Sequence, residues 1–250
     1  MIEVANISKS FNKQRVLHNV SAVFEEGKIS MVIGKSGSGK TVLLKSIIGL
    51  HTPEEGEIFF DNREFTKANI KFKREIRKEI GMVFQGGALF TSATVEDNVR
   101  FPLDLFTNMS KAEKQKQVDS CLERVNIENA HKLFPAEISG GMQKRVSIAR
   151  AIVLNPKYLF CDEPNSGLDP QTAILIDRLI RDITIEYNTT TIVNTHDMNS
   201  VMEIADQIYF IHEGKKWWKG GREDIFNTDN IELNDFVFAS ELYKKIKDKS

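Results

Sequence analysis

Residues 34–41 have the sequence Gly-Lys-Ser-Gly-Ser-Gly-Lys-Thr, which matches the phosphate-binding pattern Gly-x-x-x-x-Gly-Lys-Ser/Thr. The apolar run at 29–33 predicts a buried strand before this loop, and the apolar residues of 43–50 recur behind it with helical spacing. A strand, a glycine-rich turn and a helix in this order point backbone N–H groups at an anion. The alternative, a turn that binds nothing, is disfavoured because every fixed position is filled and both flanks are correct. We therefore expect an α/β unit that binds phosphate.

The side chains of this loop predict its chemistry. Lys40 is expected to reach the β- and γ-phosphates of a nucleotide, and the hydroxyl of Thr41 is expected to bind Mg²⁺. The candidate nucleotide-binding residues of the loop and the helix start are Gly34, Ser36, Gly37, Ser38, Gly39, Lys40, Thr41 and Val42.

Polar side chains stand at the ends of three other predicted strands. The apolar strand at 158–161 ends in Asp162 and Glu163, of which the first is expected to reach Mg²⁺ and the second to polarise a water. Gln85 can bring an amide to the metal or to the attacking water. His196 can hydrogen-bond a γ-phosphate oxygen. Together these residues predict a hydrolytic site.

A second glycine-bearing turn, Ser139-Gly140-Gly141-Met142, also opens a predicted helix and is a second anion site. One nucleotide that needs two such helix starts can take the second from a twin subunit. The segment 166–169, just past Glu163, would then cross between the subunits.

Strand and helix patterns alternate along most of the chain, which indicates a mainly parallel sheet with helices on both faces. The predicted strands cover 2–8, 16–24, 29–33, 58–60, 80–84, 158–161, 190–195, 208–211 and 215–219, and the predicted helices of this core cover 68–79, 143–154 and 171–187. The first two strands flank a polar turn at 10–15 and add an antiparallel part. Phe11 at that turn either stacks on an adenine or caps the core of the sheet, and the local pattern leaves both open.

Two regions depart from this alternation. From 86 to 138 the strand signals stop, and helices are expected at 95–105 and 111–125, as a helical subdomain inserted into the core. The apolar group Ala88, Leu89, Phe90, Phe101, Leu103, Leu105 and Phe106 either forms the core of this lobe or a groove for a partner helix. The tail at 231–250 mixes apolar residues with lysines, as an amphipathic helix that docks on another surface would.

Charge and cysteine usage narrow the protein class. Thirty-four basic and thirty-five acidic residues give a net charge of −1, which argues against general attraction to nucleic acids. No apolar run approaches the ~20 residues that span a bilayer. The chain begins with a strand-like segment, so no signal peptide is expected. Cys121 and Cys161 lack metal-ligand spacing, and the second lies in an apolar run. We expect a soluble protein of a reducing compartment.

In their order along residues 1 to about 225, these motifs resemble those of the ATP-binding cassette (ABC) ATPases, a family with a P-loop NTPase core. Phe11 and Val16 resemble the positions beside the adenine, 34–41 the Walker A loop and Gln85 the Q-loop glutamine. Residues 139–142 resemble the signature, Asp162 and Glu163 the Walker B pair, 166–169 the D-loop and His196 the switch histidine. Residues 226–250 would then form a C-terminal helical tail.

The resemblance implies ATP and Mg²⁺ as cofactors, with Glu163 as general base and His196 holding the γ-phosphate and the water. Lys40 and Gln85 complete the implied catalytic set, and Thr41, Gln85 and Asp162 the implied metal ligands. Two copies of the chain would sandwich two ATP molecules. The residues contributed by the partner copy would be Ser139, Gly140, Gly141, Met142 and Asp169.

Three positions depart from the family pattern. Ile138 replaces a leucine and Met142 a glutamine in the signature, and Val42 stands where the family often has Ser or Thr. Val42 offers no hydroxyl to the α-phosphate, so only its backbone N–H can contribute, and nucleotide affinity is expected to fall modestly.

Residues 84–90, Phe-Gln-Gly-Gly-Ala-Leu-Phe, are similar to a phrase of the Mla-type lipid-transport cassettes, and Met142 fits the same group. This resemblance implies a cytoplasmic ATPase, peripheral on the bacterial inner membrane, that moves phospholipid between envelope membranes. A multi-span permease would contact Ala88, Leu89 and Phe90. The partner of the tail stays open: the tail would bind the sister chain or a small regulatory subunit, or cover its own core. The alternatives are the ATPase of an amino-acid or ion importer and, in another class, a soluble ABC protein acting on ribosomes or DNA.

Overall fold

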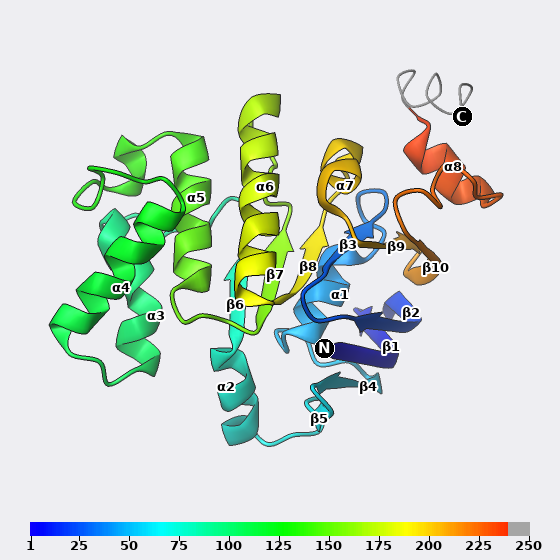
Figure 1. Cartoon of the computed structure of the whole chain (residues 1–250). Helices are drawn as coiled ribbons and strands as arrows, with labels where there is room; N and C mark the ends of the chain where they lie inside the picture. The colour runs from blue at the N-terminus through cyan, green and yellow to red at the C-terminus, as the bar shows by residue number, and fades with distance from the viewer. Residues whose placement is uncertain (240–250) are drawn as a thin grey trace.

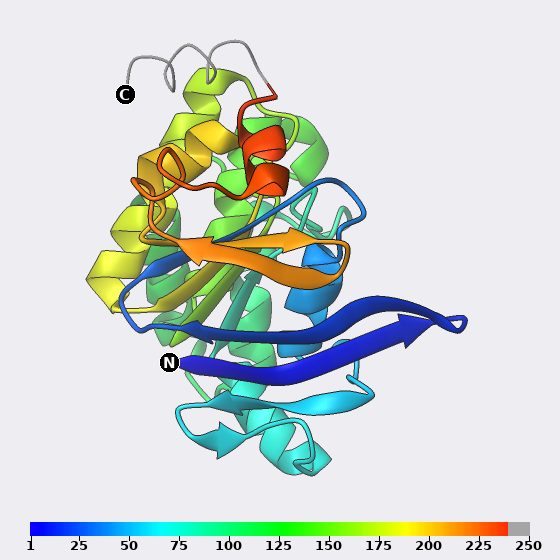
Figure 2. The same cartoon turned by 90° about the vertical axis from the view of Figure 1, so that its right-hand side faces the viewer.

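The computed structural model describes residues 1–239 and contains two sheets (Figure 1). The large six-stranded sheet has the order β10 (Lys215–Gly220), β9 (Gln207–His212), β3 (Ile29–Ile33), β8 (Thr190–Asn194), β7 (Tyr158–Asp162), β6 (Ile80–Val83). The small four-stranded sheet has the order β2 (Gln14–Phe24), β1 (Ile2–Phe11), β4 (Glu55–Phe60), β5 (Arg63–Glu64). Figure 2 shows the blue and cyan strands of the small sheet as a layer of their own.

Helices connect these strands along the chain. They are α1 (Lys40–Ile47), α2 (Ile70–Lys78), α3 (Val95–Phe106), α4 (Lys111–Arg124), α5 (Gly140–Ile152), α6 (Pro170–Tyr187), α7 (Met198–Ile204) and α8 (Ile231–Val237), with a short 3₁₀ turn at Pro135–Glu137. None of the helices within residues 1–239 combines the length and apolarity needed to cross a membrane.

The central strands β3, β7 and β8 of the large sheet are buried on both faces, as parallel strands generally are. Its strands β6, β7, β8, β3 and β9 pair in parallel, and β10 pairs antiparallel at the edge. Alternate residues of β7 enter different cores: Leu159 and Cys161 pack with helices α3 to α8, whereas Tyr158 and Phe160 pack with α1 and the small sheet. The predicted α/β fold, with helices on both faces of a mainly parallel sheet, is confirmed. Cys161, from the apolar run at 158–161, is buried.

The element boundaries differ from the predicted ones where local geometry allows a tighter connection. β1 and β2 continue through most of the predicted 10–15 turn, because Asn12 and Lys13 both adopt positive φ and close the hairpin with two residues. Helix α5 begins at Gly140, three residues before the predicted start, since Ser139 caps it. The short β5 and α7 carry too few residues to show a clear period, and their sequences do not predict them.

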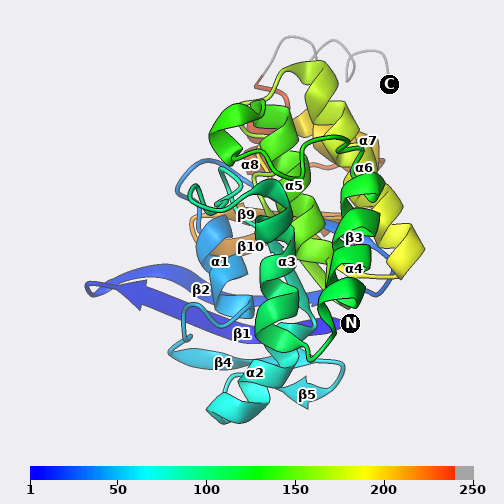
Figure 3. The same cartoon turned by 90° about the vertical axis from the view of Figure 1, so that its left-hand side faces the viewer.

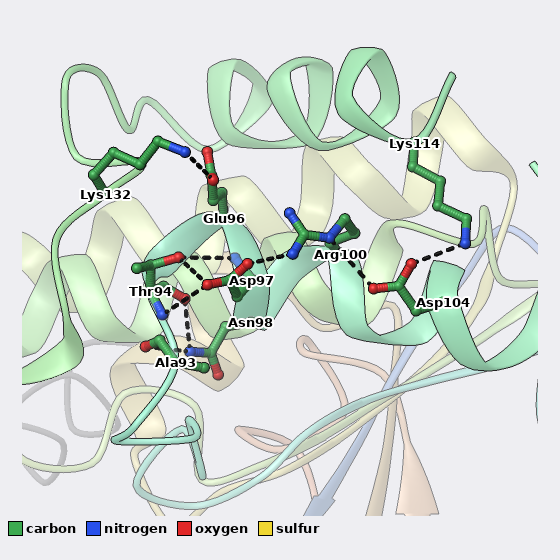
Figure 4. A network of polar contacts seen from close by, with 9 residues as sticks. All are labelled: Ala93, Thr94, Glu96, Asp97, Asn98, Arg100, Asp104, Lys114 and Lys132. Atoms are coloured by element: carbon green, nitrogen blue, oxygen red, sulfur yellow. Dashed lines mark hydrogen bonds and ion pairs between the residues drawn. The ribbon is translucent and has the colours of Figure 1, made fainter. Parts of the chain in front are cut away.

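The helices α3 and α4 lie between β6 and β7 in the chain, at the β6 end of the large sheet (Figures 1 and 3). Thr94 caps α3 through a capping box with Asp97. Arg100 pairs with Asp97 and Asp104 on the same helix, and Lys114 Nζ lies 2.8 Å from Asp104 Oδ1, which ties α4 to α3 (Figure 4). The helical subdomain is therefore stabilised by ion pairs within α3 and between α3 and α4, in addition to its buried apolar residues.

The described part of the tail is α8, followed by Phe238 and Ala239. Leu233 and Val237 are buried in the same core as the helices of the large sheet, and Trp217 Nε1 donates to Glu232 Oε2 at 2.9 Å. Residues 231–239 thus cover their own chain. The remainder of the predicted tail helix, 240–250, lies outside the described residues.

Candidate nucleotide-binding site

The glycine-rich loop joins the end of β3 to the start of α1, as predicted. Its glycines Gly34, Gly37 and Gly39 have φ values of 148°, 78° and 107°, which favour residues without a Cβ. A Cβ on Gly34 would lie 2.2 Å from the backbone oxygen of Ile211, so no other residue fits there without a shift of the chain.

Lys40 is buried beneath this loop and folds back onto it. Its Nζ donates to the backbone oxygens of Gly34 at 2.8 Å and Lys35 at 3.2 Å. Burial lowers the pKa of Lys40, while the carboxylates of Glu163 and Asp162 oppose that shift. An ammonium held only by carbonyl oxygens gains charge-assisted bonds when a phosphate replaces them.

The register of the sheet gathers oxygen ligands at the carboxyl ends of the strands. Asp162 pairs with Asn194 across β7 and β8, and Asn194 Nδ2 donates to Asp162 Oδ1 at 3.1 Å. Thr41 Oγ1 donates to the same carboxylate oxygen at 3.1 Å. Within residues 1–239 no group of three or more His, Cys, Asp and Glu side chains could hold a metal. One hydroxyl and one buried carboxylate instead suit Mg²⁺, which takes few protein ligands beside phosphate oxygens and water.

Glu163 and His196 lie together at the same edge. His196 Nδ1 lies 2.9 Å from Glu163 Oε1 and 2.8 Å from Oε2. Glu163 has a φ of 51°, an uncommon value for a non-glycine residue, and its N–H donates to the backbone oxygen of Asn194 at 3.0 Å. The strained turn aims the carboxylate at the imidazole, so each is the partner of the other in this structure.

A cavity of about 630 Å³ unites these groups. It is lined by Val16, Lys35, Ser36, Gly37, Gly39, Lys40, Thr41, Val42, Gln85, Glu163, His196 and Phe236. Phe11 is absent from this lining: its side chain is 39% exposed and its ring lies 5.0 Å from that of His51. Phe11 belongs to neither of the two buried apolar clusters, and its contact with adenine stays a prediction.

The second glycine turn lies in a different groove, of about 470 Å³. Ser139, Gly140 and Gly141 line it together with Gly167 and Asp169. The two cavities share no lining residue. The structure therefore brings the signature-like turn next to the predicted crossing segment, and does not bring either into the lining of the cavity of the phosphate loop.

Four residues near the site are not among those predicted from the sequence. Asn194 ends its strand directly after the apolar residues Ile192 and Val193, a polar residue that could have been noticed. Phe236 reaches the cavity from α8, and Asn165 follows the Walker B-like pair. Lys144 is buried on α5, and its Nζ has no hydrogen-bond partner within residues 1–239. Nothing in the local sequence around these last three indicates where the chain places them.

A glycine-rich loop between strand and helix, two acids at the next strand end and a histidine beside them define an α/β nucleotide-hydrolase site. The family model described as ABC transporter matches residues 17–166. The chain belongs to the ABC transporter family and is an ABC ATPase of a membrane transporter.

Similar proteins carry different substrate names. The "Probable ribonucleotide transport ATP-binding protein mkl" of Mycobacterium leprae is 38% identical over 94% of this chain and 68% of its own length. The "Methionine import ATP-binding protein MetN" of Clostridioides difficile is 41% identical over 92% of this chain and 72% of its own. The "Intermembrane phospholipid transport system ATP-binding protein MlaF" of Haemophilus influenzae is 37% identical over 95% and 90%.

Among solved structures, one ATP-binding cassette is similar with a TM-score of 0.82 and 31% identity over 89% of this chain and 99% of its own. It is described as a dimer in a post-hydrolysis state bound to ADP and Pi. The fold and the ATPase class predicted from the sequence are thereby confirmed.

Proposed function

We propose that this ABC ATPase powers the movement of phospholipid between bacterial envelope membranes, from the cytoplasmic face of the inner membrane. The observation that carries the proposal is the 84–90 segment, which forms one wall of an apolar groove. The phospholipid-transport relative from Haemophilus influenzae supports it, because the alignment spans 90% of that protein.

The groove has a volume of about 320 Å³. Phe84, Ala88 and Phe90 line it from the segment after β6, and Phe101 and Phe106 from α3. The rings of Phe90 and Phe101 lie 4.8 Å apart, and each side chain is 44% exposed. Exposed apolar surface of this kind suits the apolar face of a helix, and we assign it to a cytoplasmic helix of the permease.

Arginine fixes the backbone of this wall. Arg150 on α5 donates to the backbone oxygens of Ala88 at 2.9 Å and Gly87 at 2.8 Å. Because α5 begins at the signature-like turn, a shift of that helix during ATP binding would move the wall that the permease contacts.

For hydrolysis we propose the following roles. Lys40 exchanges its carbonyl partners for the β- and γ-phosphates, and Glu163 accepts a proton from the attacking water. When the imidazole of His196 releases the carboxylate of Glu163, it can hold the γ-phosphate. Thr41, Asp162 and Gln85 would hold Mg²⁺, which neutralises charge on the phosphates.

We further propose that two copies of the chain close on two ATP molecules. The separate groove that contains Ser139 and Asp169 supports this arrangement, since it leaves the anion-binding turn outside the cavity of its own chain. Gly140, Gly141 and Met142 complete the surface that would face the nucleotide of the other copy. We propose the sister chain or a small regulatory subunit as the partner of the C-terminal tail.

The experiment is affinity purification of the full chain from detergent-solubilised membranes, followed by lipid analysis. Co-purification of a multi-span permease with phospholipid supports the proposal. Phe90→Asp should abolish capture of the permease by placing a carboxylate in the groove. Ile185→Asp, at an exposed apolar position on α6, is the matched control and should not.

A second candidate function is the ATPase of an importer for a soluble substrate, which the methionine-import relative favours. A permease that arrives with a soluble binding protein and without phospholipid would support the importer and overturn the lipid proposal.

A further inference from the structure

Asn165 stands between the catalytic turn and the segment 166–169, and its side chain joins three elements. Its Nδ2 lies 2.6 Å from Oδ1 of Asp177 on α6 and 2.9 Å from Oγ of Ser200 on α7. Ser200 Oγ also donates to Asp197 Oδ2 at 3.4 Å, and Asp197 follows His196 directly. One amide therefore connects the loop of the switch histidine to the start of the crossing segment.

The residue at the centre of this network, Asp177, is an acid in a buried position. Asp177 is 2% exposed, and no ion pair within residues 1–239 involves it. The pKa of Asp177 is raised to about 6, chiefly by burial and also by the carboxylates of Asp197 and Glu203, against the opposing effect of the hydrogen bonds from Asn165 and Ser200. Burial of a carboxylate without an ionic partner costs stability, and the hydrogen bonds from Asn165 and Ser200 offset part of that cost.

Backbone hydrogen bonds carry the network to the reacting groups. The N–H of Ser166 donates to the oxygen of Glu163 at 3.2 Å, and that of Leu168 to the oxygen of Asn165 at 3.2 Å. A cavity of about 490 Å³ is lined by Glu163, Asn165 and His196 among others, so the amide borders the same space as the Glu163–His196 pair.

We propose that Asn165 is a positioning residue for ATP hydrolysis. Through Asp177 and Ser200 it holds the loop of His196 in register with the turn of Glu163. A displacement of the segment 166–169 by the second subunit then moves both groups together. The inference rests on the roles proposed above for Glu163 and His196.

The test exchanges the two members of the pair in the full chain. Asn165→Asp places a second carboxyl beside that of Asp177. The two can share at most one proton, so the two-hydrogen donor that bonds both Asp177 and Ser200 is lost, and the elements should separate. We expect kcat at saturating Mg·ATP to fall by about 10- to 100-fold with KM for ATP unchanged, because small misplacements of catalytic groups have effects of this size. The double exchange Asn165→Asp with Asp177→Asn restores an amide–carboxylate pair and should return kcat to within about threefold of the original.

Equal kcat values for the single and double variants, or values within twofold of the original for both, would overturn the proposal. If Asn165→Asp does not fold, Ser200→Ala takes its place: it removes one acceptor of the amide and should lower kcat without a change in KM. An unchanged kcat in Ser200→Ala would then overturn the proposal. Glu163→Gln, assayed in parallel, tests the role of Glu163 separately from the exchange.

Discussion

The cavity at the phosphate loop and the groove at the second glycine turn differ in the chemistry they contain. The cavity gathers an ammonium, a carboxylate and an imidazole from Lys40, Glu163 and His196. The groove offers a hydroxyl, helix-start N–H groups, glycines and the guanidinium of Arg145, with the carboxylate of Asp169 bound to its own helix start. One chain therefore carries a charged centre and a separate anion-binding turn. We propose that the charged centre takes such a turn from another copy to enclose a nucleotide.

The largest effect is expected from Glu163→Gln, which removes the proposed base from the cavity but keeps its shape. Turnover should fall by about 1,000-fold, the middle of the range for a general base. ATP binding should persist and trap a dimer, measured by size-exclusion chromatography with ATP. Glu128→Gln at an exposed position in the helical lobe is the control. A Glu163→Gln chain with the original turnover would contradict the assignment.

The next largest effect is expected on ATP affinity when Lys40, the buried cation of the cavity, is replaced. Lys40→Met should weaken ATP binding by about 10- to 100-fold, because hydrogen bonds to charged groups contribute about 1.5–3 kcal/mol. Titration calorimetry measures the affinity. Lys35→Met in the same loop should change it little, since Lys35 is expected to contribute its backbone. If both variants lose the same affinity for ATP, the loss reflects the net charge of the loop and not a specific bond from Lys40.

A smaller effect is expected in the groove, and it separates the two regions most sharply. A Cβ on Gly140 meets nothing within 4 Å in its own chain, so Gly140→Ala should fold with unchanged or slightly higher stability. ATP-driven dimerisation should weaken by about tenfold, since overpacking at a contact costs about 1–3 kcal/mol. Analytical ultracentrifugation with ATP measures this loss.

Gly141→Ala is the comparison for that prediction, because its Cβ would lie 2.9 Å from Cγ2 of Thr172 on α6 and so affects the chain itself. If Gly140→Ala dimerises like the original chain, the groove does not face the partner nucleotide, and the contrast between the two regions loses its functional meaning.

The smallest effect is expected at the edge of the cavity. Phe11→Ala should weaken ATP binding by about fivefold if the ring stacks on adenine, at the low end of stacking energies. Phe236→Ala is informative beside it, because Phe236 lines the cavity here and packs its ring 5.6 Å from that of Phe210. If Phe236→Ala loses affinity for ATP and Phe11→Ala does not, the adenine lies on the side of the cavity formed by α8. Fluorescent ATP analogues measure both.

Much of the fold and of the charged centre could be predicted because the signals are local. The strand before Gly34, the helix behind Thr41 and the apolar run that ends in Asp162 each depend on neighbouring residues only. The helix starts at Ser139 and Asp169 follow from caps that a few residues define. Short elements such as α7 and β5 lack enough residues for a period, so their formation depends on packing.

The sequence by itself determined the class of the chain, because a phosphate loop, two acids at a strand end and a second glycine turn each need a fixed local order of residues. Only the tertiary structure decided the distances between them. Sheet register set Asp162 beside Asn194, and helix packing brought Asn165 to Asp177 across 12 positions of sequence and Phe236 to the phosphate-loop cavity. These contacts join segments that are distant along the chain, and no local sequence pattern predicts them. They form because sheet register and the burial of helices bring the segments together.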